Sequence, residues 1–84
     1  MNKDQLNSLN VRKAANAAMT VIDAIQDMHP AEQLAGITAT FLLLADHQGY
    51  TAQDMFSITA NIMNHADGRR PEFAAAAQYM KEEL

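Results

Sequence analysis

The sequence has 84 residues, no cysteine and a formal net charge of −4, and hydrophobic residues make up 49% of it. This length accommodates one domain, and the hydrophobic share excludes a chain that is disordered throughout. Without cysteine the chain has no disulfides, no thiolate metal ligands and no thiol nucleophile. We therefore expect a single helical domain over residues 1–84, with residues 1–5 frayed.

The first helix is predicted from about residue 8 to residue 28. Apolar residues recur there at steps of three and four, which is the spacing of one helix face. Ser8 or Asp4 is expected to cap its start. The residues expected to face the core are Val11, Ala14, Ala15, Ala18, Val21, Ile22, Ile25 and Met28.

The second helix is predicted to begin at Pro30 and to stop at Gly49. Proline suits the first helical position because its missing N–H would have no intrahelical partner, and glycine suits the position just past the end. Leu42 and Leu43 make this helix apolar almost all round, which is typical of a central or interfacial helix. Its expected inward face is Leu34, Ile37, Phe41 and either Leu44 or Ala45.

The third and fourth helices are predicted after Thr51 and after Arg70. Thr51 and Asp54 resemble a capping box, and the third helix should end within residues 65–68. The fourth helix starts at Pro71 and includes a run of four alanines. Since no segment shows the alternation of a strand, we predict an all-α fold. Short loops favour a compact bundle of four short helices with antiparallel connections.

The three histidines and several charged residues are predicted to lie at helix ends. We expect each histidine near a helix C-terminus, where a protonated ring suits the helix dipole. In an up-and-down bundle, one end would hold the polar cluster His29, Glu32, His65, Asp67, Arg69 and Arg70. Such a cluster could bind a divalent metal or respond to pH. Because helix ends are polar in most proteins, we interpret it as a solvated cluster without a metal.

The sequence offers no pattern typical of an enzyme. It lacks a Gly-x-Ser-x-Gly turn and a phosphate-binding glycine loop. Ser8 and Ser57 are its only serines, and Ser57 lies among apolar residues. Four short helices also leave little room for a substrate pocket. We expect no catalytic residues, no cofactor and no small-molecule substrate.

Residues 44–58 partly match a helix-turn-helix. Ala45, Gly49 and Met55 have the spacing of that motif, while Gln48 occupies a position that is usually Leu or Ile. No Lys or Arg lies between Lys13 and Arg69, so the second helix of the motif has no side chain for phosphates. The spacing makes a DNA-binding regulator that uses residues 44–58 the alternative interpretation. Because basic residues are missing there, our main interpretation includes no nucleic-acid partner.

The surplus of large apolar side chains favours a protein–protein interaction surface. A thin four-helix bundle cannot easily bury all of the large apolar side chains of this sequence. Those left over are Leu42, Leu43, Phe56 and Met63. Contiguous apolar patches on small proteins usually mark interaction sites, although the same side chains could close the core of a monomer. We predict that these four residues form the surface for a protein partner, for a homodimer, or for both.

The segment TATFLLLADHQGYTAQDMFSITANIMN, residues 38–64, resembles small accessory proteins encoded by bacteriophages. The resemblance implies a small bacterial or phage protein that binds a host component. The first residues contain no apolar signal core, and the longest apolar run, residues 41–45, is far too short for a membrane span. We expect a non-catalytic interaction module in the cytoplasm of a bacterium or of a phage-infected host cell, with no membrane partner.

Overall fold

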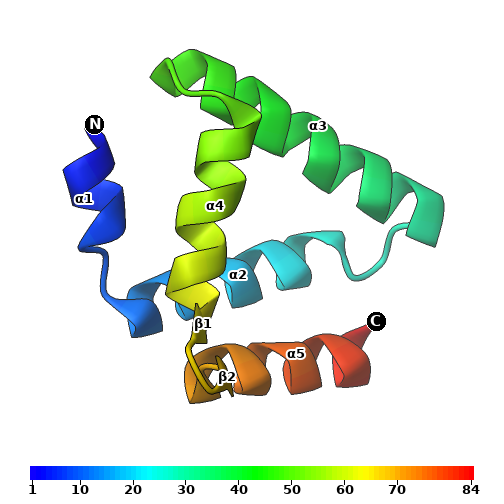
Figure 1. The fold of residues 1–84 in the computed structure, drawn as a ribbon. Coiled ribbons are helices and arrows are strands. Elements are labelled where there is room, and N and C mark those ends of the chain that lie inside the picture. The colour runs from blue at the N-terminus through cyan, green and yellow to red at the C-terminus, as the bar shows by residue number, and fades with distance from the viewer.

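The computed structural model describes all 84 residues and confirms the all-α class. A short helix precedes the four longer ones, and a hairpin of two strands, each of two residues, joins the last two. Figure 1 shows the arrangement of these elements. They are α1 (Lys3–Asn7), α2 (Val11–Ile25), α3 (Pro30–Gln48), α4 (Ala52–Met63), β1 (Asn64–His65), β2 (Gly68–Arg69) and α5 (Pro71–Glu83).

The N-terminal segment forms a short capped helix where the sequence predicted frayed residues. The Asn2 side chain accepts a hydrogen bond from the Gln5 amide at 2.9 Å, and the Gln5 side chain accepts one from the Asn2 amide at 2.9 Å. The reciprocal cap satisfies two N–H groups that a helix start leaves unpaired. Asn10, rather than Ser8 or Asp4, caps α2, because its side-chain oxygen accepts from the amides of Arg12 and Lys13.

Helix α3 begins and ends as predicted. Pro30 is its first residue, and Gly49 follows its last turn with a φ of 80°, the left-handed conformation that glycine adopts without strain. His29 occupies the N-cap, where its Nδ1 accepts a hydrogen bond from the Ala31 amide at 3.1 Å. The expectation that His29 lies at a helix C-terminus is therefore wrong, since its ring serves the start of α3.

The hairpin between α4 and α5 is the only strand pairing. Asn64 pairs with Arg69, and His65 pairs with Gly68. Gly68 has a φ of 132°, which a residue with a side chain rarely adopts. This tight reversal delivers Pro71 to the start of α5, and the sequence pattern did not reveal it because each strand has only two residues.

Helices α2 and α5 form the main packed pair although they are far apart in the sequence. Figure 1 shows them side by side and running in the same direction, while α4 crosses from the end of α3 to the start of α5. Helix α3 packs mainly against α4. The short connections are thus present, but the largest helix contact is not between neighbours in the chain.

The buried core is small and lies where α2, α4 and α5 meet. Ala15, Ile62, Phe73 and Ala76 form its contiguous cluster, and only six residues of the chain are buried. Two alanines in this cluster let α2 and α5 approach closely, because their side chains add almost no width. Helix α3 contributes only one buried residue, Ala45.

Candidate interaction surface

The first two-thirds of α3 lie almost uncovered. From Pro30 to Thr40, every residue except Gln33 is exposed. The Leu34 side chain is 73% exposed, although the sequence placed it on the inward face. That expectation is wrong for Leu34 and Ile37, because α3 runs away from the core and meets α4 only near its C-terminal end. The link to α2 that the structure shows is the hydrogen bond from Gln33 Nε2 to the Ile25 carbonyl, 2.9 Å.

The exposed leucines of α3 lie on two sides of the helix. We call Leu34, Ile37, Phe41 and Leu44 the α3 ridge, because their spacing of three and four residues aligns them along one face. Leu43 follows Leu34 by nine residues, which is two and a half turns, and so lies on the opposite side. Leu43 is 71% exposed, so the two leucines differ in side but hardly in exposure.

Three of the four residues predicted as an interaction surface are exposed. Leu42 and Phe56 line one small open cavity of about 260 Å³ between α3 and α4, and Leu43, which follows Leu42 in the chain, is exposed but does not line it. We call Leu42, Leu43 and Phe56 the outer patch. Met63 lies at the far end of α4, half-buried against the core cluster, so the structure does not place it with the other three.

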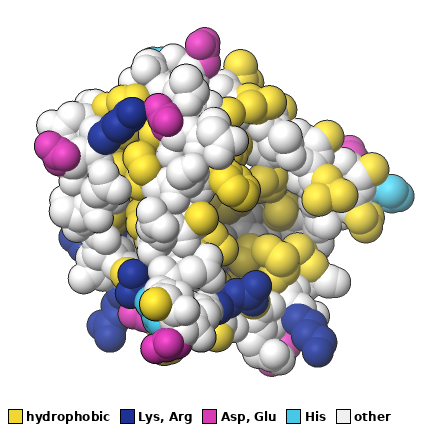
Figure 2. All heavy atoms as spheres, viewed as in Figure 1, with side chains coloured by type: hydrophobic (Ala, Val, Ile, Leu, Met, Phe, Trp, Pro, Cys, Tyr) yellow, Lys and Arg dark blue, Asp and Glu magenta, His cyan; other side chains and the backbone are white.

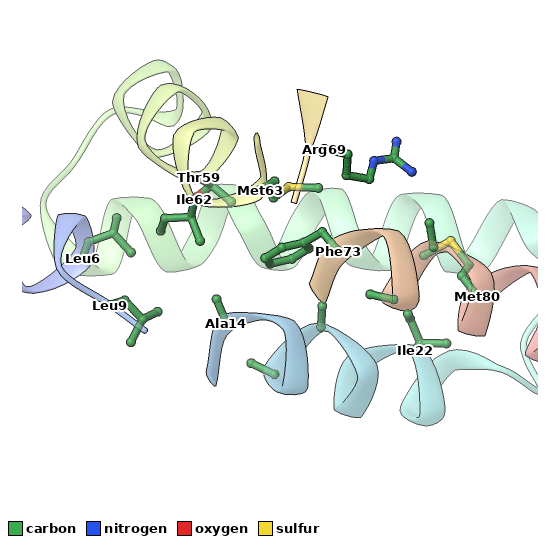
Figure 3. Close-up of a pocket in the computed structure, with 14 residues that line it drawn as sticks. Leu6, Leu9, Ala14, Ile22, Thr59, Ile62, Met63, Arg69, Phe73 and Met80 are labelled. Carbon is green, nitrogen blue, oxygen red and sulfur yellow. The ribbon is translucent and has the colours of Figure 1, made fainter. Parts of the chain in front are cut away.

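A larger apolar groove lies between α2, α4 and α5. Its volume is about 500 Å³, and Figure 3 shows the side chains that line it, with Phe73 of α5 between α4 and α2 and Arg69 at the edge. The α2 wall includes Ala14, Ala17 and Ala18, and the α5 wall includes Ala76 and Ala77. We call this cavity the alanine groove. Sequence reasoning missed it because groove alanines have the same helical spacing as core alanines.

The apolar surface is concentrated on one hollowed face. Figure 2 shows hydrophobic side chains gathered in a hollow below α3, beside α4 and above α5. On α2, Val21 and Met28 are 43% and 48% exposed, although the sequence placed them on the core face. They remain uncovered because α3, which follows α2 after a short connection, does not fold back along it.

The predicted polar cluster is divided into two groups. Figure 1 shows the start of α3, which carries His29 and Glu32, well separated from the β1–β2 hairpin. The hairpin region holds the other four residues, His65, Asp67, Arg69 and Arg70. The up-and-down arrangement that would unite them fails because α4 does not return along α3 but crosses towards α2. No three His, Asp or Glu side chains in the chain lie close enough to share a metal ion.

Both groups of this polar cluster make local structural hydrogen bonds. His65 Nδ1 accepts from the Asp67 amide at 3.1 Å, which supports the hairpin turn. Arg70 Nη2 donates to the Asn61 carbonyl at 3.3 Å, while its buried Nε has no hydrogen-bond partner. Arg69 forms no ion pair, since the one salt bridge in the chain joins Lys3 to Asp54.

Two polar side-chain contacts join elements that are far apart in the sequence. Lys3 Nζ lies 2.9 Å from Asp54 Oδ2, and this hydrogen bond and the opposite charge raise the pKa of Lys3 and lower the pKa of Asp54. The Tyr79 hydroxyl of α5 donates to Asp23 of α2. This hydrogen bond, with desolvation, raises the pKa of Tyr79 to about 12, because the carboxylate disfavours a second negative charge.

The helix-turn-helix segment forms two helices joined by residues 49–51. Its second helix, α4, has no basic side chain, and its one acidic residue, Asp54, is paired with Lys3. Gln53, Ser57 and Asn61 are exposed on α4, but Gln53 Nε2 donates to Ser57 Oγ at 3.2 Å. The two helices therefore carry polar side chains that could contact base edges, but no basic side chains that could contact phosphates.

Comparisons with known proteins identify no relative of this chain. No family model, no curated protein and no solved structure matches this chain. None of its helices combines the length and the apolar character needed to cross a bilayer.

Proposed function

We propose that this protein is a non-catalytic helical interaction module that associates with itself through α3. The observation that carries the proposal is the size of its accessible surface, 6101 Å² for a chain of 9.2 kDa. The scaling law for folded monomers gives about 4,900 Å² at this mass, so about 1,200 Å² is in excess. A standard interface buries about 800 Å² on each partner, so the excess suffices for one.

The spread of the chain supports the same proposal. Its radius of gyration is 13.2 Å, where the scaling law for a domain of this length gives about 12 Å. The exposed large apolar side chains include five on α3 alone: Leu34, Ile37, Leu42, Leu43 and Leu44. A second copy that covers α3 would bury this surface and complete the small core.

The test is the molar mass in solution, measured by light scattering over a range of concentrations. We expect a mass near twice 9.2 kDa that falls towards 9.2 kDa on dilution. A mass that stays at 9.2 kDa up to millimolar concentration would contradict self-association. Hydrogen exchange at the same concentrations gives a second readout, because amides near Leu34 should become protected only when the mass doubles.

The outer patch supports a second protein partner in the same proposal. Phe56 is 63% exposed and lines its cavity together with Leu42, so the patch combines aromatic and aliphatic side chains. The resemblance of residues 38–64 to phage accessory proteins suggests that this partner is a host protein. Replacing Phe56 by Asp should then weaken partner binding without changing the mass of the protein alone.

The α3–α4 connection supports DNA binding as the alternative, because residues 49–51 join two helices as a helix-turn-helix requires. Phosphate contacts would have to come from Arg69, Arg70 or the start of α2. Binding should therefore weaken steeply with salt and fall strongly in an Arg69→Ala, Arg70→Ala double variant. A gel-shift assay without any retardation at low salt would exclude this alternative.

A further inference from the structure

We infer that the alanine groove binds a fatty acid, a ligand with one alkyl tail and one carboxylate. The tail lies along the apolar walls of the groove, and Arg69 holds the carboxylate at the edge. The ligand is bound and not converted. No residue of α3 lines the groove, so this site is independent of self-association through α3.

The groove has the size and the lining of a ligand site. Its volume of about 500 Å³ lies within the roughly 300–1,000 Å³ of small-molecule pockets. Thr59 and Arg69 are the only polar residues that line it. Ile62, Phe73 and Ala76 line the groove and also belong to the buried cluster. A ligand in the groove would therefore extend the small core of the protein.

The groove is elongated, which suits an alkyl tail. Figure 3 shows Leu6 and Leu9 towards one end and Met80 towards the other. The wall on α2 runs from Ala14 to Ile22, about 12 Å at the helical rise per residue. Leu9 and Met80 are 40% and 45% exposed, so apolar surface meets water at both ends. A thin alkyl tail can cover this surface, whereas a helix about 10 Å across could insert only its side chains.

The one charge in the groove selects an anionic head group. Arg69 has no ion-pair partner within the chain, and the hairpin fixes its position, since Arg69 pairs with Asn64 and follows Gly68. The neighbouring Arg70 is directed elsewhere, because its guanidinium donates to the Asn61 carbonyl. One carboxylate therefore matches one free guanidinium. A cationic head group would find no acidic side chain in the groove.

The first experiment follows the methionine methyl groups by NMR while dodecanoate is added below the concentration at which it forms micelles. We expect saturable shifts at Met63 and Met80, which line the groove. Met28, which is exposed and lies outside the groove, should not shift. Replacing dodecanoate by decanoate should weaken binding by up to about 15-fold, because two fewer methylene groups are buried.

The second experiment tests the head group. Dodecyltrimethylammonium has the same alkyl tail with a positive charge, which the net charge of −4 on the protein favours. We nevertheless expect tighter binding of dodecanoate, because Arg69 is the charge nearest the ligand. Arg69→Gln should weaken dodecanoate binding about fivefold, as for an exposed ion pair, without weakening the cationic ligand. Arg12→Gln, at an exposed arginine outside the groove, should change neither affinity more than about twofold.

The third experiment fills the groove with a side chain. Ala17 and Ala75 are both exposed helical alanines, and only Ala17 lines the groove. Ala17→Leu should weaken dodecanoate binding at least about tenfold, because the leucine occupies space that the alkyl tail needs. Ala75→Leu should change it less than about twofold. Circular dichroism checks that both variants keep their helices, as expected because leucine is a good helix former.

Four results would overturn the inference. Shifts at Met28 as large as those at Met80, or equal binding of the two head groups, would show non-specific partition of the alkyl tail. Shifts confined to Met1 and Met55 would place the ligand in the separate cavity that these residues line. Shifts at Met63 on raising the protein concentration without ligand would show that a second copy fills the groove. Absence of saturable binding would exclude the site and leave self-association through α3 unaffected.

Discussion

A comparison of α5 with α3 shows that the more apolar helix of this chain is not the more buried one. Helix α5 is rich in alanine, yet it supplies two residues of the core, Phe73 and Ala76. Helix α3 carries a run of three leucines, and its one buried residue is an alanine. The difference follows from position, since the hairpin lays α5 along α2 while α3 leaves the core after a short connection. A partner would therefore cover the exposed apolar surface of α3.

The largest expected effect comes from two phenylalanines in these contrasting environments. Phe73→Ala removes a side chain that is 7% exposed and should lower the free energy of unfolding by about 3–5 kcal/mol. Phe56→Ala, at an exposed position, should change it by less than about 0.5 kcal/mol. Urea unfolding of the monomer measures both, and equal losses would show that the two regions do not differ in packing.

A smaller effect is expected from the helix caps. Asn10→Ala removes the acceptor at 2.9 Å from the Arg12 amide and should cost about 1 kcal/mol in global unfolding, because α2 belongs to the core. His29→Ala removes the cap of α3, whose first turns contribute no buried residue. We expect faster hydrogen exchange at the start of α3 and little change in the urea midpoint. A global loss in His29→Ala as large as that in Asn10→Ala would contradict the comparison.

The smallest effect concerns pH and the α2–α5 contact. In a Tyr50→Phe background, the absorbance of ionised tyrosine should titrate near pH 12, the raised pKa of Tyr79. An Asp23→Asn change should bring the midpoint towards the ordinary value of about 10. Since the folded-state pKa is the higher one, the stabilising contribution is present below about pH 10 and is lost as the pH rises towards 12. A midpoint that Asp23→Asn does not move would show that the contact is absent in solution.

Local sequence signals predicted most helix boundaries. Pro30 and Pro71 mark the starts of α3 and α5, and Gly49 marks the end of α3. Proline fixes its own backbone φ angle, and glycine can adopt a positive one, so both signals act locally. The cap of α1 was also readable, since Asn2 and Gln5 have capping-box spacing, but the polar segment around them suggested fraying. The hairpin was not readable, because two-residue strands carry no alternation.

The arrangement of the helices could not be predicted from the same patterns. Apolar residues at steps of three and four mark a face without saying what covers it, so Leu34 and Phe73 give the same signal. The spacing puts both on an apolar helix face, and only the course of the chain through α4 leaves one exposed and buries the other. The exposure of Leu42, Leu43 and Phe56 was predictable, because the chain has more large apolar side chains than a thin bundle can bury. The alanine groove was not, because alanine fits close packing and open walls equally well.

The pairing of α2 with α5 has a consequence for the order of folding. Contacts between α3 and α4 are local, but Ala15 packs only once Phe73 and Ala76 are present, about 60 residues further along the chain. During synthesis the core therefore closes only after α5 has left the ribosome. Until then Ile22 and Ile62 have no α5 to cover them, and the nascent chain presents more apolar surface than the finished one. A chaperone that binds such apolar segments would bind this protein until α5 docks and covers them.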